Sequence, residues 1–140
     1  MSRDVPRRAL DEIDALAHRH LDLVGLWRRA SDVLARAVPH YWAPCWYTLD
    51  PDSLLITSHF LDGIPELPAE WLAQEYYDND DVNKLVDVAR SPRGISTLHD
   101  ATGGDPGASR RWQENMAYGA DQEVITALRD RSGAVWARWA

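Results

Sequence analysis

Histidine and cysteine are the side chains of this sequence most suited to binding a metal, and their spacing decides whether they can share one. The chain has five histidines: His18, His20, His40, His59 and His99. None of them forms the pair, four residues apart on a helix with an acid between, that zinc enzymes use. Cys45 is the single cysteine, and one cysteine near one histidine does not make a zinc site. We therefore expect no metal and no cofactor.

Two other segments carry groups that could hold an ion. The run Asp78-Asn79-Asp80-Asp81 offers oxygen ligands but lacks the glycine and distal glutamate of a calcium loop. Because Asp and Asn favour helix caps, the run predicts a capped junction between two helices. The loop over 102–107 precedes a predicted helix and could offer amides to an anion. It has neither the P-loop lysine nor the dinucleotide glycine spacing, and Asp105 would repel an anion. We expect a plain turn there.

Catalytic signatures are absent from the sequence in the forms that can be recognised locally. No serine stands between glycines in the hydrolase pattern, and the many carboxylates occupy surface-like positions. We expect a protein that is not an enzyme. A small hydrolase or isomerase is the less favoured alternative, and it would need a cleft in which a nucleophile and a base meet.

Composition limits the classes of partner and compartment. The chain has 140 residues, enough for one domain, and a formal net charge of −7. That acidity argues against direct binding of nucleic acid, which needs a basic face. A single cysteine excludes an intramolecular disulfide and fits a reducing, cytoplasmic setting. No apolar run approaches the roughly 18 residues of a membrane span, and no signal peptide is visible.

The hydrophobic pattern predicts an α/β (α+β) domain. A long helical stripe over 9–38, in which Asp22 could cap a second helix after a break, precedes a hairpin of two strands. Helical pieces follow the loop after the hairpin, then a short strand, another helix and a second hairpin. The predicted strands are 45–49, 54–60, 94–98, 123–128 and 134–139, and the later helices begin near 68, 82 and 109. We expect an antiparallel sheet with covering helices and a long N-terminal helix.

Several stretches resemble a known family. They are Leu21 to Trp27, Trp46 to Pro51, Gly94 to Leu98, Ala101 to Pro106, Arg111-Trp112 and Gly119 to Glu123. They are similar to GAF-like domains, relatives of the PAS sensor fold, that precede the DNA-binding domain of actinobacterial LuxR-type helix-turn-helix regulators.

The resemblance implies a signal-receiving domain over 21–140, preceded by an N-terminal helical extension over 1–20. A closing helix would follow the last strand in such a domain, and this chain departs from the pattern by ending at Ala140. It also implies that DNA is bound by another domain and not by this one.

Two ligand signatures of GAF domains are incomplete here. Asn83-Lys84 begins the cyclic-nucleotide signature, but no later phenylalanine and Asp-Glu pair follow it. We expect both residues to be exposed on a helix. Bilin-binding relatives use a Cys-His pair, whereas Cys45 is followed by Trp46, so we expect Cys45 to be a small buried hydrophobe.

Aromatic residues remain as the candidate ligand site. Seven tryptophans accompany a single phenylalanine. The residues that could face one cavity between sheet and helices are Trp46, His59, Trp71, Tyr77, Trp112 and Met116. They either hold a small ligand or simply fill the core, since aromatics dominate ordinary cores.

The sequence thus predicts a sensor domain of a transcription regulator. It would bind a small, largely apolar molecule, or act through a homodimer formed by the N-terminal helix, whose stripe repeats near heptad spacing. A ligand-free protein-interaction domain is the main alternative.

Overall fold

The computed structural model describes residues 4–40, 42, 44–62, 68–78, 80–117 and 119–139. The chain forms two compact units, one over Met1–Pro44 and one over Cys45–Ala140. Among the described residues, no helix has the length and apolar character needed to cross a membrane.

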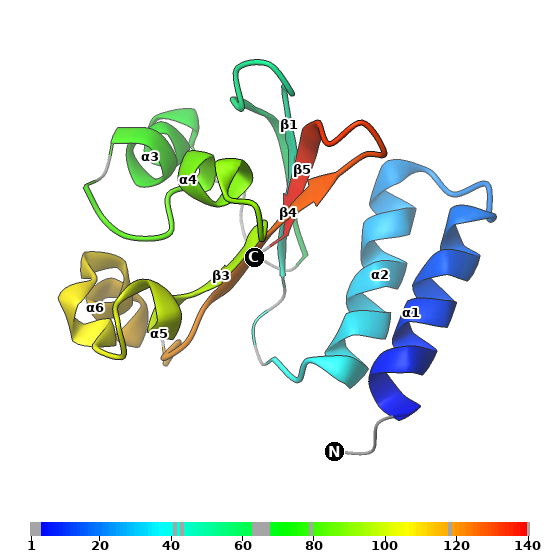
Figure 1. The fold of residues 1–140 in the computed structure, drawn as a ribbon, viewed down its shortest axis with the longest axis horizontal. Coiled ribbons are helices and arrows are strands. Elements are labelled where there is room, and N and C mark those ends of the chain that lie inside the picture. The colour runs from blue at the N-terminus through cyan, green and yellow to red at the C-terminus, as the bar shows by residue number, and fades with distance from the viewer. Residues whose placement is uncertain are drawn as a thin grey trace. The chain divides into compact units, whose positions relative to one another are not determined.

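The first unit is a helical hairpin. Helix α1 spans Asp4–Ala17 and helix α2 spans Leu23–Ala37, and the two lie side by side (Figure 1). The predicted helix over 9–38 is therefore divided, at the point where Asp22 was expected to allow a break. The Asp22 carboxylate caps α2 by accepting a hydrogen bond from the Gly25 N–H at 2.7 Å.

The second unit is built on a five-stranded sheet with the order β2-β1-β5-β4-β3 and antiparallel pairs throughout. The strands are β1 Cys45–Leu49, β2 Ile56–Leu61, β3 Ile95–Thr97, β4 Val124–Arg129 and β5 Val135–Trp139. Tyr47 of β1 pairs with His59 on one side and with Arg138 on the other, and Arg138 pairs with Ala127. Because paired residues share a face, these four side chains lie on one face of the sheet.

The helices of this unit lie on one side of its sheet (Figure 1). They are α3 Ala69–Ala73, the π-helical turn η1 Gln74–Asp78, α4 Leu85–Arg90, α5 Leu98–Ala101, the 3-10 turn η2 Pro106–Ala108 and α6 Arg110–Met116. Tyr47 and Ala127 of the sheet pack with Leu72 of α3, Tyr76 of η1 and Leu85 of α4 in one core cluster. The predicted α+β class and antiparallel sheet are confirmed.

Two local predictions around α4 are wrong: the helix predicted to begin near 82 begins at Leu85, and the residues just before it are not as expected. Asn83 and Lys84 are not exposed residues within a helix: both precede α4, and Asn83 is buried with φ +57°. The Asn83 side-chain oxygen accepts a hydrogen bond from the Ser96 hydroxyl at 2.6 Å. Lys84 is half-buried. The left-handed backbone of Asn83, which Asn tolerates better than most residues, ends the preceding turn before the helix begins.

Candidate functional site

A buried group of arginines and tyrosines lies between the sheet and its helices. We call Tyr47, Tyr76, Arg111 and Arg138 the arginine–tyrosine cluster. The four residues come from β1, η1, α6 and β5, so segments far apart in the sequence contribute to it. All four are buried: Tyr47 and Arg138 have no exposed surface, Arg111 is 6% exposed and Tyr76 is 7% exposed.

Arg138 is the unusual member of the cluster. Its Nε, Nη1 and Nη2 atoms are buried and have no hydrogen-bond partner among the residues that the structure describes. Its guanidinium carbon lies 4.4 Å from the centre of the Tyr76 ring and 5.2 Å from that of Tyr47. Two cation–π contacts therefore offset part of the cost of burying this charge.

The two tyrosines are joined through their hydroxyls. The Tyr47 and Tyr76 oxygens are 3.0 Å apart, and the rings meet edge to face with centroids 5.4 Å apart. One hydroxyl donates to the other, so the accepting tyrosine keeps its own proton for a further partner. Burial raises the pKa of both Tyr47 and Tyr76, which keeps both hydroxyls protonated.

Arg111, unlike Arg138, has a carboxylate partner. Its Nη1 lies 3.3 Å from Oε1 of Glu123, and its guanidinium carbon lies 5.6 Å from the Tyr76 ring centre. Tyr76 thus contacts both arginines. The two guanidinium groups have different electrostatic roles: Arg111 takes part in an ion pair, whereas Arg138 has none among the described side chains.

The start of α6 holds Arg111 in place. Ser109, fully buried, caps this helix by accepting a hydrogen bond from the Trp112 N–H at 3.2 Å. One carboxylate oxygen of Asp81 accepts from the Ser109 hydroxyl at 3.0 Å and from the Arg111 N–H at 2.9 Å. Asp81 therefore ties two distant segments together, where the sequence predicted a capped junction between two helices.

Burial alone would raise the pKa of Asp81. The N–H groups of Arg111 and Val82, the Ser109 hydroxyl and the Arg111 charge outweigh that effect and lower it. The carboxylate is thereby kept ionised at neutral pH.

Cys45 lies beside the cluster at the start of β1. It is half-buried and packs against the core cluster that contains Tyr47. Burial raises the pKa of its thiol, which disfavours the reactive thiolate. The prediction of a small buried hydrophobe holds in part, since Cys45 packs against the core cluster but is only half-buried.

The chemistry of the cluster follows from a count of donors. The Arg138 guanidinium carries five N–H donors and no acceptor, and arginine keeps its charge in proteins. One tyrosine hydroxyl adds a further donor, while the phenol oxygens are the weak acceptors at hand. A buried cation is costly unless it is paired. The group that complements this arrangement is an acceptor with negative charge.

The structure brings only some of the predicted site residues to this cluster. His59 lies on the same face, with its ring centroid 6.4 Å from that of Tyr47. Trp71 of α3 is 44% exposed and meets the Tyr76 ring edge to face at 6.3 Å. Trp46 points to the opposite face of β1, because successive side chains of a strand alternate, and it packs on Trp139 at 6.3 Å.

The other three predicted residues have separate surroundings. The Tyr77 hydroxyl accepts from the Ile56 N–H at 2.8 Å and donates to the Leu54 carbonyl at 2.9 Å. The Trp112 indole N–H donates to the Asp121 carbonyl at 3.1 Å. Met116 is 43% exposed. The six predicted residues therefore do not gather around one point.

Sequence reasoning missed the four residues of the cluster itself. One signal was available for Arg138: it is the charged residue in the apolar run Val135-Trp136-Ala137-Arg138-Trp139. No comparable signal marks Tyr47 or Tyr76, whose partners are set by the fold.

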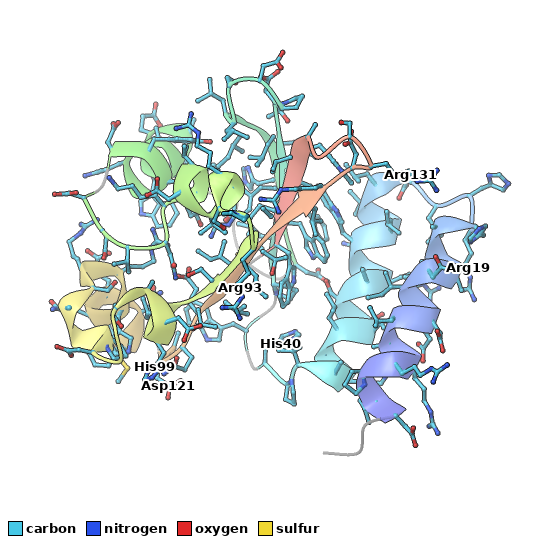
Figure 2. All side chains as sticks on the ribbon, in the orientation of Figure 1. Arg19, His40, Arg93, His99, Asp121 and Arg131 are labelled. Carbon is cyan, nitrogen blue, oxygen red and sulfur yellow. The ribbon has the colours of Figure 1, made fainter. Side chains whose placement is uncertain are left out.

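Metal chemistry finds no support in the described residues, where no group of His, Cys, Asp and Glu side chains is placed to hold an ion. His99, for example, is exposed on α5 (Figure 2). In comparisons with known proteins, no family model, no curated protein and no solved structure matches the chain.

Proposed function

We propose that this chain is the signal-sensing domain of a cytoplasmic transcription regulator, of the GAF-like kind that the sequence resembles. The single observation that carries the proposal is the fully buried Arg138, which lacks a polar partner among the described residues. A charged side chain without a partner inside a domain favours a role in binding, since stability alone would favour an apolar residue at that position.

The position of the cluster supports the same proposal. It lies where a sheet faces a layer of short helices, and its Tyr76 comes from the π-helical turn η1. Such turns are often found at functional sites. Ligand sites commonly combine apolar and aromatic side chains with a few convergent polar groups, and the cluster has the same mixture of residue types. The expected ligand is still largely apolar, but it also has a polar end that contacts Arg138.

The proposal also includes a homodimer formed through the helical unit. Leu10 of α1 is 68% exposed, and Leu23 and Val24 of α2 are each 39% exposed. Apolar side chains left in water on a helical pair favour association with a second copy.

A binding screen tests the sensor part. The purified chain would be heated in the presence of a library of small metabolites, and native mass spectrometry would detect compounds that purify with it. We expect a small molecule that raises the melting temperature. A complete lack of binders, together with a crystal structure in which Arg138 contacts only water, would favour the ligand-free interaction domain instead.

Two further measurements test the homodimer and the role in a transcription regulator. Sedimentation of the wild type and of Leu10→Glu should show a dimer that the substitution weakens, and a monomeric wild type at high concentration would contradict the dimer. A helix-turn-helix encoded in the same reading frame would support the regulator, and a frame without a DNA-binding segment would count against it.

A further inference from the structure

We propose that the ligand of this domain is a small organic carboxylate, whose carboxylate group pairs with the Arg138 guanidinium and whose apolar body lies against the rings of Tyr47 and Tyr76. This inference rests on the proposed sensor function and adds the chemical class of the ligand.

The guanidinium accounts for the charged end. Its nitrogens form a planar fork that matches the two oxygens of a carboxylate. No described carboxylate lies in ion-pair range of Arg138, while the neighbouring Arg111 is paired with Glu123. The protein thus supplies a counter-ion for one buried arginine and leaves the other to a group from outside.

The tyrosines account for the choice of an organic anion. Their rings lie within 4.4 and 5.2 Å of the guanidinium carbon, and Leu72 and Leu85 belong to the same core cluster. An apolar body gains from these surfaces, which offer nothing to a bare inorganic ion. The hydroxyl proton left over in the Tyr47–Tyr76 pair can be donated to a carboxylate oxygen.

Trp71 supplies the reporter. The buried Arg138 guanidinium contacts the Tyr76 ring. Trp71 contacts the same ring, and its side chain is 44% exposed. Since all three guanidinium nitrogens are buried, a ligand reaches them only if an element that covers them moves, and we assign this movement to η1, which carries Tyr76. That movement changes the environment of the Trp71 indole.

Benzoate is the probe that tests the inference, with benzamide as its uncharged counterpart of the same shape and inorganic phosphate as an anion without an apolar body. Binding is measured by melting temperature and tryptophan fluorescence on the full chain. We expect benzoate to raise the melting temperature and to change the fluorescence, and we expect benzamide and phosphate to have little effect. In Trp71→Phe, most of the fluorescence change should be lost while the thermal shift remains.

Substitution of Arg138 gives the decisive comparison. Arg138→Met should fold with a melting temperature at or above that of the wild type, because a buried unpaired charge is replaced by an apolar side chain of similar length. Its benzoate dissociation constant should rise at least about tenfold, the effect of losing charge-assisted hydrogen bonds. Tyr76→Phe keeps the ring, removes one hydroxyl, and should weaken benzoate binding several-fold without changing the fold.

The failures are distinguishable. If benzamide binds as well as benzoate and Arg138→Met alters the binding of neither probe, the domain is a sensor but its ligand is not a carboxylate. If phosphate gives the same thermal shift and fluorescence change as benzoate, and both depend on Arg138, the ligand does not need an apolar body. If Arg138→Met unfolds and Tyr76→Phe binds benzoate normally, Arg138 is structural and the inference fails. If the metabolite screen also yields no binder, the sensor function fails with it.

Discussion

The carboxylate of Asp81 accepts a hydrogen bond from the backbone N–H of Arg111 at 2.9 Å, thirty residues further along the chain. The same oxygen accepts from the Ser109 hydroxyl. Asp81→Ala removes both partners at the start of α6, and we expect it to lower the free energy of unfolding by about 2 kcal/mol, the upper range for a helix cap. Urea unfolding measures this loss.

Asp80→Ala is the matched control for that substitution. Asp80 is fully exposed and lies 3.8 Å from Lys84, so its removal should leave the free energy of unfolding nearly unchanged. Equal effects of the two substitutions would contradict the role given to Asp81.

The stability contributed by Asp81 should depend on pH. Its pKa is lowered in the folded state, so the unfolded chain takes up a proton first as the pH falls. The contribution is therefore fully present above the unfolded value of about 3.9, and it is lost as the pH falls through the folded value. The difference in unfolding free energy between wild type and Asp81→Ala should be constant near neutral pH and should shrink in acid. A difference that grows in acid would contradict this assignment.

Arg111 should matter for stability in a way that Arg138 does not. Arg111→Met leaves the largely buried Glu123 carboxylate without the partner it has at 3.3 Å, and we expect a loss of about 3 kcal/mol. Arg110→Met serves as the control, since Arg110 pairs with Glu114 at 3.0 Å with both side chains 51% exposed. That exposed pair should be worth less than about 0.5 kcal/mol. Chemical unfolding of the two variants side by side would refute the distinction if both lost the same amount.

Gly94 should not tolerate a side chain. Its φ is +63°, and an added Cβ would lie 2.3 Å from Nη1 of Arg129. Arg129 donates from Nη2 to the Ala89 and Ser91 carbonyls at the end of α4, so a shift of its side chain also loosens that helix end. Gly103 has the same φ with open space around it. We expect Gly103→Ala to cost about 1 kcal/mol for the backbone alone and Gly94→Ala to cost at least about 1 kcal/mol more. Thermal unfolding of the pair isolates the contact with Arg129, and identical losses would show that it contributes nothing.

The Cys45 thiol should react slowly in the folded protein. Burial raises its pKa, and each unit of that rise lowers the thiolate fraction about tenfold. At pH 8 we expect a disulfide reagent to label Cys45 far faster in urea than in buffer. Equal rates in the two conditions would show that the thiol is accessible and ionised in the folded chain.

The elements of the sheet could be predicted from the sequence because their signals are local. Strand β1 occupies Cys45–Leu49 as predicted, since an apolar run of this kind ends at turn residues around Asp50-Pro51. The helix that Ser109 caps also begins where the sequence placed it.

The cluster could not be predicted, because its contacts join residues far apart in the chain. In β5 the alternation rule assigns a charged residue to the solvent side, yet Ala137 and Arg138 are both fully buried on opposite faces of the central strand. Asn83 was missed for a similar reason: its partner Ser96 and its left-handed backbone are consequences of tertiary structure.

The position of Tyr77 has a consequence for self-association. Strand β2 is an edge strand of the sheet. An edge strand has unpaired backbone donors and acceptors that can pair with a strand of another chain. The Tyr77 hydroxyl pairs with the N–H of Ile56, the first residue of this strand, and with the C=O of Leu54 just before it, so neither group is free to pair with another chain. A single phenol thus satisfies two backbone groups beside the edge strand, and a phenylalanine in its place would keep the ring and leave both groups without this partner.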